Sequence, residues 1–221
     1  MLNPDKTTLL DRAKGRHCNG NVSDLLQAGD LDLVRSQVEA HCAGILEALG
    51  IDYRHDHNTE GTPARMARMY VDEVFAGRFQ ERPRTTDFPN VNGLDEMVVV
   101  GPVSVRSTCA HHFCPIVGTA VIGVIPSGRI IGLSKFARLT TWVMSRPQIQ
   151  EEATIQLADE IEHAITPKAL GVVVRASHSC MTWRGVRETG SMATTSVMRG
   201  LLRDNAAARA EFLKLIEVNG K

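Results

Sequence analysis

The spacing of apolar side chains is helical in the first part of the chain. Between residues 31 and 49, apolar positions recur every three or four residues and Gly50 follows them, which predicts an amphipathic helix that ends there. Its apolar face is expected to contain Val34, Val38, Cys42, Ile45 and Leu49. A second helix is predicted from Thr62 to Gly77, because Thr62 suits an N-cap and Pro63 suits the first turn. The apolar face of this second helix is expected to contain Met66, Met69, Tyr70 and Val74.

Beyond residue 93 the spacing becomes mostly that of strands. Strands are predicted over 97–105, with an interruption at Gly101-Pro102, over 116–125, from Gly171 onward, and over 194–197. The strand from Gly171 is expected to carry both His178 and Cys180. Helices are predicted from an N-cap at Ser134, over 149–165 and over 206–218. Strands and helices in this order, after a helical first part, predict the α+β class.

A linker composition separates these two parts. Residues 78–93 include Pro83, Pro89 and Gly93, which favour turns and loops over regular structure. We therefore predict an N-terminal helical region over 1–93 and a second domain over 94–221. Residues 1–30 are polar and contain Gly15, Gly20 and Gly29, so this stretch is a candidate for flexibility.

Composition narrows the class of protein. Lysine plus arginine number 25, and so do aspartate plus glutamate, so no overall charge directs the chain to nucleic acid or to an anionic membrane. No apolar run approaches the roughly 20 residues of a membrane helix, and the N-terminus lacks the apolar segment of a signal peptide. The five cysteines are an odd number, which favours a reducing compartment. We therefore expect a cytoplasmic protein.

Two clusters of cysteine and histidine carry the candidate chemistry. Cys109 and His112 are three positions apart, a spacing that lets a thiolate and an imidazole reach one zinc ion. Cys180 supplies a third ligand, and His111 and His178 remain as bases. Three protein ligands leave one coordination position open, as in catalytic zinc sites. Two alternatives remain: Cys114 as a fourth ligand would make the site structural, and isolated cysteines and histidines are often buried without a metal.

Two pairs of cations are candidates for anion binding. Lys135 and Arg138 lie three positions apart in the first turn of a predicted helix, where backbone N–H groups and the helix dipole already favour an anion. Arg65 and Arg68 have the same spacing on the helix after Thr62, so they project together. Solvated surface charges are the alternative interpretation for both pairs.

These motifs, in this order, resemble those of the GTP cyclohydrolase I family. The matching stretches are residues 62–70, 109–113, 131–135, 146–151 and 178–185, and the similarity runs from about residue 31 to the end. The resemblance implies a tunnelling fold, in which an antiparallel sheet and two helices follow the helical segment. It also implies a homodecamer of two stacked five-subunit rings with active sites shared between neighbours. The implied reaction converts GTP and water to formate and 7,8-dihydroneopterin triphosphate.

The resemblance also implies roles for individual residues. Cys109, His112 and Cys180 would hold Zn²⁺, whose bound water attacks the carbon between the two imidazole nitrogens of guanine. His178 would protonate the purine nitrogen, His111 would assist opening of the ribose ring, and Ser134 would join these catalytic residues. Glu151 would accept the paired N–H groups of the guanine edge, and Gln150, Leu133 and Ile149 would complete the base pocket. The triphosphate would lie against Ser134, Lys135, Arg138, Arg184, Arg65 and Arg68.

One position departs from the family pattern, and three other functions compete with the implied one. Ala110 stands where the family usually carries an acidic residue, which removes a candidate hydrogen bond near the metal. The competing functions are a binding protein of the same fold, a related enzyme acting on a pterin or deazapurine, and a regulatory nucleotide-binding module. Glu151, the two spare histidines and the cations favour the enzyme that acts on GTP.

Overall fold

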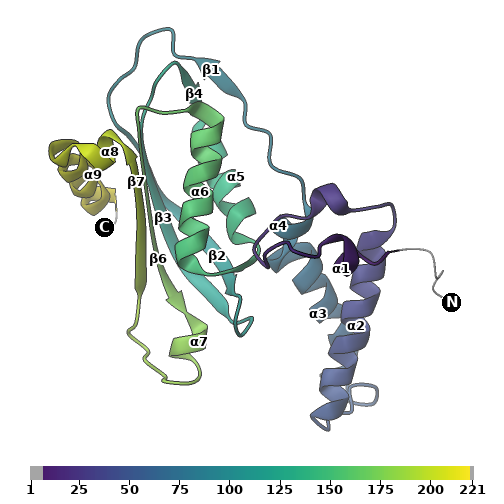
Figure 1. Cartoon of the computed structure of the whole chain (residues 1–221). Coiled ribbons are helices and arrows are strands. Elements are labelled where there is room, and N and C mark those ends of the chain that lie inside the picture. The colour runs from purple at the N-terminus through teal and green to yellow at the C-terminus, as the bar shows by residue number, and fades with distance from the viewer. Residues whose placement is uncertain (1–6, 220–221) are drawn as a thin grey trace. The chain divides into compact units, whose positions relative to one another are not determined.

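The computed structural model describes residues 7–219 and divides into two compact units (Figure 1). The units are Met1–Glu81 and Arg82–Lys221, and each is described by itself. The domain boundary that we place after residue 93 from composition stays a prediction.

The first unit is helical. Its elements are α1 (Leu9–Arg12), η1 (Ser23–Leu25), α2 (Asp30–Ala48), α3 (Thr62–Arg68), the π-helical η2 (Met69–Val74) and α4 (Ala76–Phe79). The helix predicted from residue 31 is therefore present, but its buried residues are Cys42 and Leu46. Ile45 and Leu49, which the spacing assigned to the apolar face, are 52% and 69% exposed.

The helix that contains Arg65 and Arg68 starts one position away from its predicted cap. Thr62 is the first helical residue, and the N-cap is Gly61, whose φ of 71° lies in the left-handed region that favours glycine. Pro63 occupies the first turn, as the sequence predicts. Because both arginines follow within two turns, they project from the same short helix.

The second unit is built on a five-stranded sheet. Its elements are β1 (Asp87–Pro89), β2 (Val98–Cys109), β3 (Pro115–Ile125), β4 (Arg129–Ile131), α5 (Leu133–Met144), β5 (Pro147–Gln148), α6 (Gln150–Ile165), β6 (Ala169–His178), α7 (Ser179–Thr182), β7 (Ala193–Gly200), α8 (Leu201–Asp204) and α9 (Ala206–Asn219). The strand order is β5-β2-β3-β6-β7, with β5 parallel to β2 and the other pairs antiparallel. Strands β1 and β4 form a separate antiparallel pair.

Helices cover both faces of this sheet (Figure 1). Residues of α5 and α6, such as Leu139 and Leu157, share one buried cluster with Val172 and Val174 of β6. Val173 lies between these two in sequence and packs in another cluster, with Leu202 of α8 and Phe212 of α9. Successive strand residues point to opposite faces, so the alternation places α5 and α6 on one face and α8 and α9 on the other. The expected α+β tunnelling fold, with its helical N-terminal segment, is confirmed.

The interruption predicted at Gly101-Pro102 is present as a shift of register between Val100 and Val103, and β2 continues through it as one strand. One detail of the second unit differs from the sequence prediction. Helix α5 begins at Leu133 after an N-cap at Gly132, so Ser134 lies inside the first turn and is not the cap.

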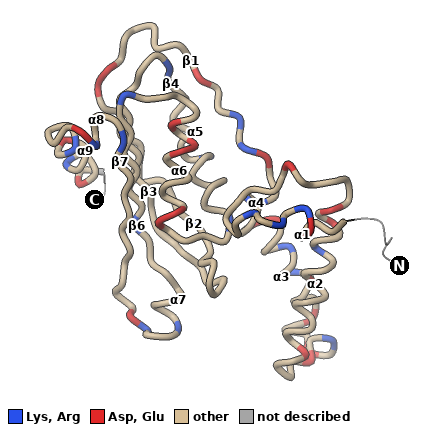
Figure 2. The backbone as a smooth tube through the Cα atoms, viewed as in Figure 1, with Lys and Arg blue, Asp and Glu red and all other residues tan. Residues whose placement is uncertain are grey.

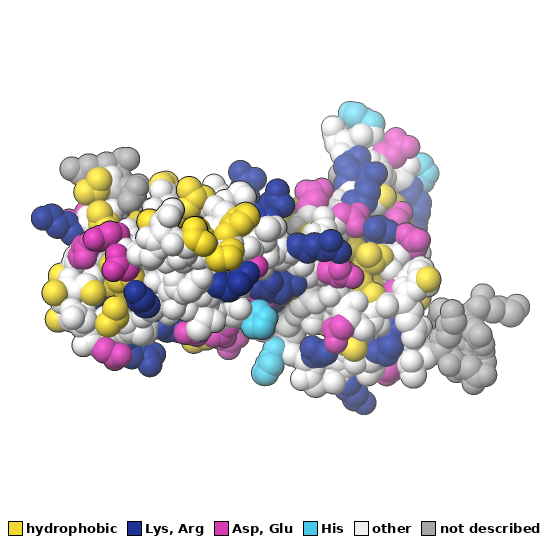
Figure 3. All heavy atoms as spheres, turned by 90° about the horizontal axis from the view of Figure 1, so that it is seen from above, with side chains coloured by type: hydrophobic (Ala, Val, Ile, Leu, Met, Phe, Trp, Pro, Cys, Tyr) yellow, Lys and Arg dark blue, Asp and Glu magenta, His cyan; other side chains and the backbone are white. Residues whose placement is uncertain are grey.

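Charged residues of both signs are interspersed along the backbone of both units (Figure 2), and charged side chains of both signs lie on the face drawn in Figure 3. This mixture agrees with the equal numbers of acidic and basic residues in the sequence. Within residues 7–219, the structure contains no helix with the length and apolar character needed to cross a membrane.

The ring of Phe212 lies over two paired glycines, which makes this contact a sensitive point of the fold. Gly123 of β3 and Gly171 of β6 are partners across the sheet, and Phe212 is fully buried. A Cβ added at Gly171 would lie 2.5 Å from Cε1 of Phe212 and 2.9 Å from Cδ1 of Leu202. These separations are too short for carbon atoms, so α9 can pack here only because glycine lacks a side chain.

We predict that Gly171→Ala lowers the free energy of unfolding by about 1–3 kcal/mol, because the ring of Phe212 must move away from the sheet. Urea unfolding of the two proteins at equal concentration measures this difference. Gly128→Ala is the matched control, since a Cβ at Gly128 meets no atom within 4 Å. An unchanged unfolding midpoint for Gly171→Ala would contradict this account of the packing.

Candidate metal centre and active site

Three strand ends meet at one end of the sheet. Strand β2 ends at Cys109, β3 begins at Pro115, and β6 ends at His178. Because β3 pairs with both neighbours, Pro115 lies opposite Thr108 and Ile116 lies opposite His178. The turn 110–114 and the residues that follow β6 are therefore close in space, although about 70 positions separate them in sequence.

Backbone hydrogen bonds hold the turn between β2 and β3. The N–H of Cys109 donates to the carbonyl of Cys114 at 2.8 Å, and the N–H of Phe113 donates to the carbonyl of Cys109 at 2.9 Å. The N–H of Ala110 donates to the carbonyl of Gln148 in β5 at 3.0 Å. The chain thus anchors the position of Ala110 through its backbone, without the acidic side chain that the family usually has there.

Cys180 reaches this turn from a short helix, and not from the strand to which the sequence assigned it. Strand β6 ends at His178, and α7 follows directly, with Cys180 as its second residue. The change from strand to helix brings ligand atoms of Cys109, His112 and Cys180 within 4.8 Å of one another. Within the described part of the chain, Cys114 does not belong to this group, which contains three potential ligands.

The donor set and its spacing fit a zinc ion. Zn–S bonds near 2.3 Å and Zn–N bonds near 2.0–2.1 Å place tetrahedral ligands roughly 3.4–3.8 Å apart. The three ligand atoms lie within 4.8 Å of one another, so small rotations of the side chains would bring them to that spacing. Two thiolates and an imidazole favour zinc over magnesium or calcium, which prefer oxygen ligands.

The surroundings of the Cys180 thiol disfavour its ionisation. Burial raises the pKa of the Cys180 thiol, and the neighbouring thiols of Cys109 and Cys114 raise that pKa further. A bound cation has the opposite effect, because its positive charge stabilises thiolates. The cluster therefore suits a cation better than it suits free thiolates.

His111 lies beside the cluster without being one of its ligands. Its Nδ1 is 4.0 Å from Sγ of Cys109, and its ring meets that of His112 edge-on, with centroids 6.3 Å apart. The side chain is exposed at the end of the sheet. This placement leaves His111 near the metal position and accessible to a substrate.

His178 is half-buried and held by a neighbouring amide. Its Nε2 lies 2.7 Å from Oε1 of Gln150. Burial lowers the pKa of the His178 imidazole below its ordinary value, and the carboxylate of Glu151 partly offsets that shift. The neutral imidazole is therefore favoured near neutral pH.

The side chain of Gln150 points into the protein. Gln150 is 4% exposed, and besides His178 it contacts strands β6 and β7. The sequence assigns this residue to a base pocket, which stays a prediction, and in the chain described here its side-chain amide has these interior partners. Thr154 and Thr195 belong to the same hydrogen-bond network. The sequence does not predict their contact, because no spacing rule relates a helix residue to a strand residue 41 positions away.

The remaining predicted residues are exposed, except for Lys135 and Ile149, which are partly buried. Glu151 is in the first turn of α6, Ser134, Lys135 and Arg138 are in the first two turns of α5, and Arg184 follows α7. Leu133 is 62% exposed, and Ile149 is the N-cap of α6. Arg65 and Arg68 are on α3 of the first unit, where Nη2 of Arg65 donates to Oγ1 of Thr62 at 2.9 Å.

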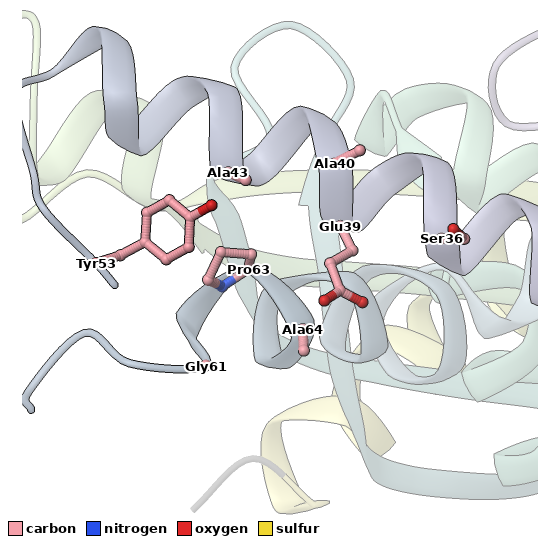
Figure 4. A pocket seen from close by; sticks show the side chains of 8 residues that line it. All are labelled: Ser36, Glu39, Ala40, Ala43, Tyr53, Gly61, Pro63 and Ala64. Carbon is pink, nitrogen blue, oxygen red and sulfur yellow. The ribbon is translucent and has the colours of Figure 1, made fainter. Parts of the chain in front are cut away.

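The first unit also contains a hollow of about 420 Å³ between α2 and α3 (Figure 4). Its lining residues are Ser36, Glu39, Ala40, Ala43, Tyr53, Gly61, Pro63 and Ala64. Most of them are small, and Glu39 is the single charged residue among them. The hollow thus lacks the cysteines, histidines and cations that gather in the second unit.

Comparison with known proteins identifies the family. The family model of GTP cyclohydrolase I matches residues 38–217. The GTP cyclohydrolase 1 of Rhodopirellula baltica is 42% identical over 82% of this chain and 78% of that protein, and that of Vibrio cholerae is 39% identical over 81% and 82%. The GTP cyclohydrolase 1 of Mycolicibacterium paratuberculosis is 40% identical over 90% of this chain and 97% of that protein. The chain therefore belongs to the GTP cyclohydrolase I family.

Proposed function

We propose that this protein is a zinc-dependent GTP cyclohydrolase I, which converts GTP and water to formate and 7,8-dihydroneopterin triphosphate. The observation that carries the proposal is the meeting of Cys109, His112 and Cys180 at one end of the sheet, inside the segment that matches the family. His111 and His178 lie beside these ligands and supply groups that exchange protons near neutral pH.

The three ligands would hold the zinc ion and leave one coordination position for water. When bound, the ion lowers the pKa of that water and so supplies a nucleophile for the guanine carbon between the two imidazole nitrogens. The rest of the chemistry is proton transfer and positioning by side chains of the protein.

The two histidines that do not bind the metal each carry out a different proton transfer. His178 protonates the purine nitrogen as the imidazole ring of guanine opens, and the half-buried position of this side chain keeps bulk water away from the transfer. His111 assists opening of the ribose ring, with Ser134 as a further catalytic hydroxyl. General acid–base transfers of this kind contribute about 10²–10⁴-fold each to the rate.

Glu151 would select guanine. Its carboxylate would accept the two N–H groups of the guanine edge, and Leu133 and Ile149 would border the base. Adenine lacks this pair of donors and would leave the carboxylate without partners, so the site would reject ATP.

The cations would bind the triphosphate. Lys135 and Arg138 lie near the start of α5, where the N-terminal N–H groups also favour a phosphate. Arg184, Arg65 and Arg68 would add charge, and the planar guanidinium groups would bind phosphate oxygens in pairs. Ser134 would contribute a hydroxyl to the same cradle.

The proposed assembly is a homodecamer of two pentameric rings with shared active sites, in the cytoplasm. Strand β7 is at the edge of its sheet, so its outer side can pair with a strand of another subunit. Trp183 and Val186, which lie three positions apart after α7, are 78% and 76% exposed, and a neighbouring subunit could cover these two apolar side chains.

The proposal is tested by turnover of GTP in ligand variants. The purified protein should release formate and yield a pterin that fluoresces after oxidation, with about one zinc per subunit. Cys109→Ser, His112→Ala and Cys180→Ser should each lose zinc and turnover together, because the attacking water depends on the ion. Full zinc and full turnover in any of the three would contradict the assignment of that ligand.

Three further variants act as controls for this test. Cys114→Ser should keep its zinc, since Cys114 lies outside the ligand group. His111→Ala and His178→Ala should also keep zinc but lose at least about 10²-fold in rate, the usual scale of a missing acid or base. Loss of metal from either histidine variant would show that a ligand had been taken for a base.

Shared active sites are tested by mixing two inactive variants. Arg68→Ala and His178→Ala are each expected to be nearly inactive alone and to regain partial activity when they are refolded together. In mixed rings, some sites would combine Arg68 from one chain with His178 from another. Activity no higher than the sum of the separate variants, in oligomers shown to be mixed, would overturn the shared site.

A further inference from the structure

We propose that Gln150 is a positioning residue that fixes the tautomer of His178, so that Nε2 keeps its proton and Nδ1 is the nitrogen that exchanges protons. The participation of Nδ1 in catalysis rests on the function proposed above. The tautomer itself follows from the hydrogen bonds of the side chains around Gln150.

Gln150 connects three elements of the second unit. It is the first residue of α6, and its buried Nε2 lies 3.1 Å from the carbonyl oxygen of Val174 in β6. The same nitrogen lies 3.2 Å from the carbonyl oxygen of Ala193 and 3.1 Å from Oγ1 of Thr195, both in β7. On the other side of the amide, Oε1 is 2.7 Å from Nε2 of His178.

The two threonines determine which atom donates in this network. Oγ1 of Thr154 donates to the backbone carbonyl of Gln150 at 2.7 Å, because a carbonyl oxygen can only accept. Oγ1 of Thr154 also lies 2.7 Å from Oγ1 of Thr195. Thr154 has used its single hydrogen, so Thr195 must donate to it. The oxygen of Thr195 is then left to accept from Nε2 of Gln150.

The orientation of the Gln150 amide is fixed by the same reasoning. The two hydrogens of Nε2 face three acceptors, namely two backbone carbonyls and the accepting oxygen of Thr195. Turning the amide over would set the acceptor Oε1 against three other acceptor oxygens, which repel it. Such contacts between buried acceptors are unfavourable. Oε1 must therefore face His178.

An amide oxygen can only accept, so His178 must donate to it from Nε2. In the neutral ring the other nitrogen, Nδ1, then carries the lone pair. The proton on Nε2 is held by Gln150, so Nδ1 must first accept a proton, which the attacking water releases, before His178 can pass it to the purine nitrogen. The amide also ties the imidazole to α6, β6 and β7, which restricts rotation of the ring.

Substituting a residue that positions His178 and substituting a residue of the base pocket have different effects on the kinetic constants. A residue that binds guanine would, when lost, raise KM for GTP, whereas a residue that orients His178 would lower kcat. In Gln150→Met, which keeps the length of the side chain but lacks the amide, we expect kcat to fall about 10-fold or more. KM should stay within about twofold of its original value, and the zinc content should be unchanged.

Gln156→Met is the matched control, because Gln156 is on the same helix and bonds to Gln148 without a link to His178. Its kcat should stay close to that of the unaltered protein. A rise in KM with unchanged kcat in Gln150→Met would overturn the positioning role.

A spectroscopic measurement on the unaltered protein tests the tautomer without relying on turnover or on a folded variant. The zinc-loaded protein would be labelled with ¹⁵N in its histidines, and the signals of His178 would be identified by their absence in His178→Asn. At a pH of about 8, where an imidazole is neutral, we expect Nε2 to carry hydrogen and Nδ1 to show the shift of a bare nitrogen. A proton on Nδ1 in the resting protein would overturn the inference. Failure of the protein to turn over GTP would contradict the proposed function but would leave this test of the tautomer intact.

Discussion

Pairing of β3 with both β2 and β6 is the constraint on which the candidate site depends. The register places Thr108 opposite Pro115 and Ile116 opposite His178, so the ends of β2 and β6 meet at the same end of the sheet. A slip of one residue along β3 would turn its side chains to the opposite face and separate the two groups of ligands. The grouping of Cys109, His112 and Cys180 therefore depends on strand register, and the apolar cores on both faces of the sheet maintain that register.

The start of α6 is the second feature that shapes the site. The helix begins beside β5, and its first residue, Gln150, is buried against β6 and β7. Thr154 and Thr195 complete a network in which each hydrogen has one consistent direction. Buried networks of this kind hold a specific geometry, because an unmatched donor or acceptor inside the protein is costly. The same helix start exposes Glu151, so the first turn of α6 has one side chain in the interior and the next at the surface.

Much of the fold could be predicted from the sequence. The apolar spacing predicts α2, α5, α6, α9 and the four long strands, and the linear spacing of Cys109 and His112 predicts two ligands of the metal group. The sequence could not predict features that depend on which elements pack together in space. The buried residues of α2 are Cys42, which the spacing predicts, and Leu46, which it does not, and Ile45 and Leu49 are exposed in the single chain. The partners of Gln150 could not be predicted, since they depend on how α6 packs against β6 and β7.

The central claim is that turns at one end of the sheet assemble a zinc site with three protein ligands. X-ray absorption at the zinc edge, on the protein without substrate, tests this claim most directly. The account predicts two sulfur neighbours near 2.3 Å and one imidazole nitrogen near 2.0–2.1 Å, with a light atom from solvent in the fourth position. A first shell with three sulfur neighbours, or with four protein ligands, would contradict it.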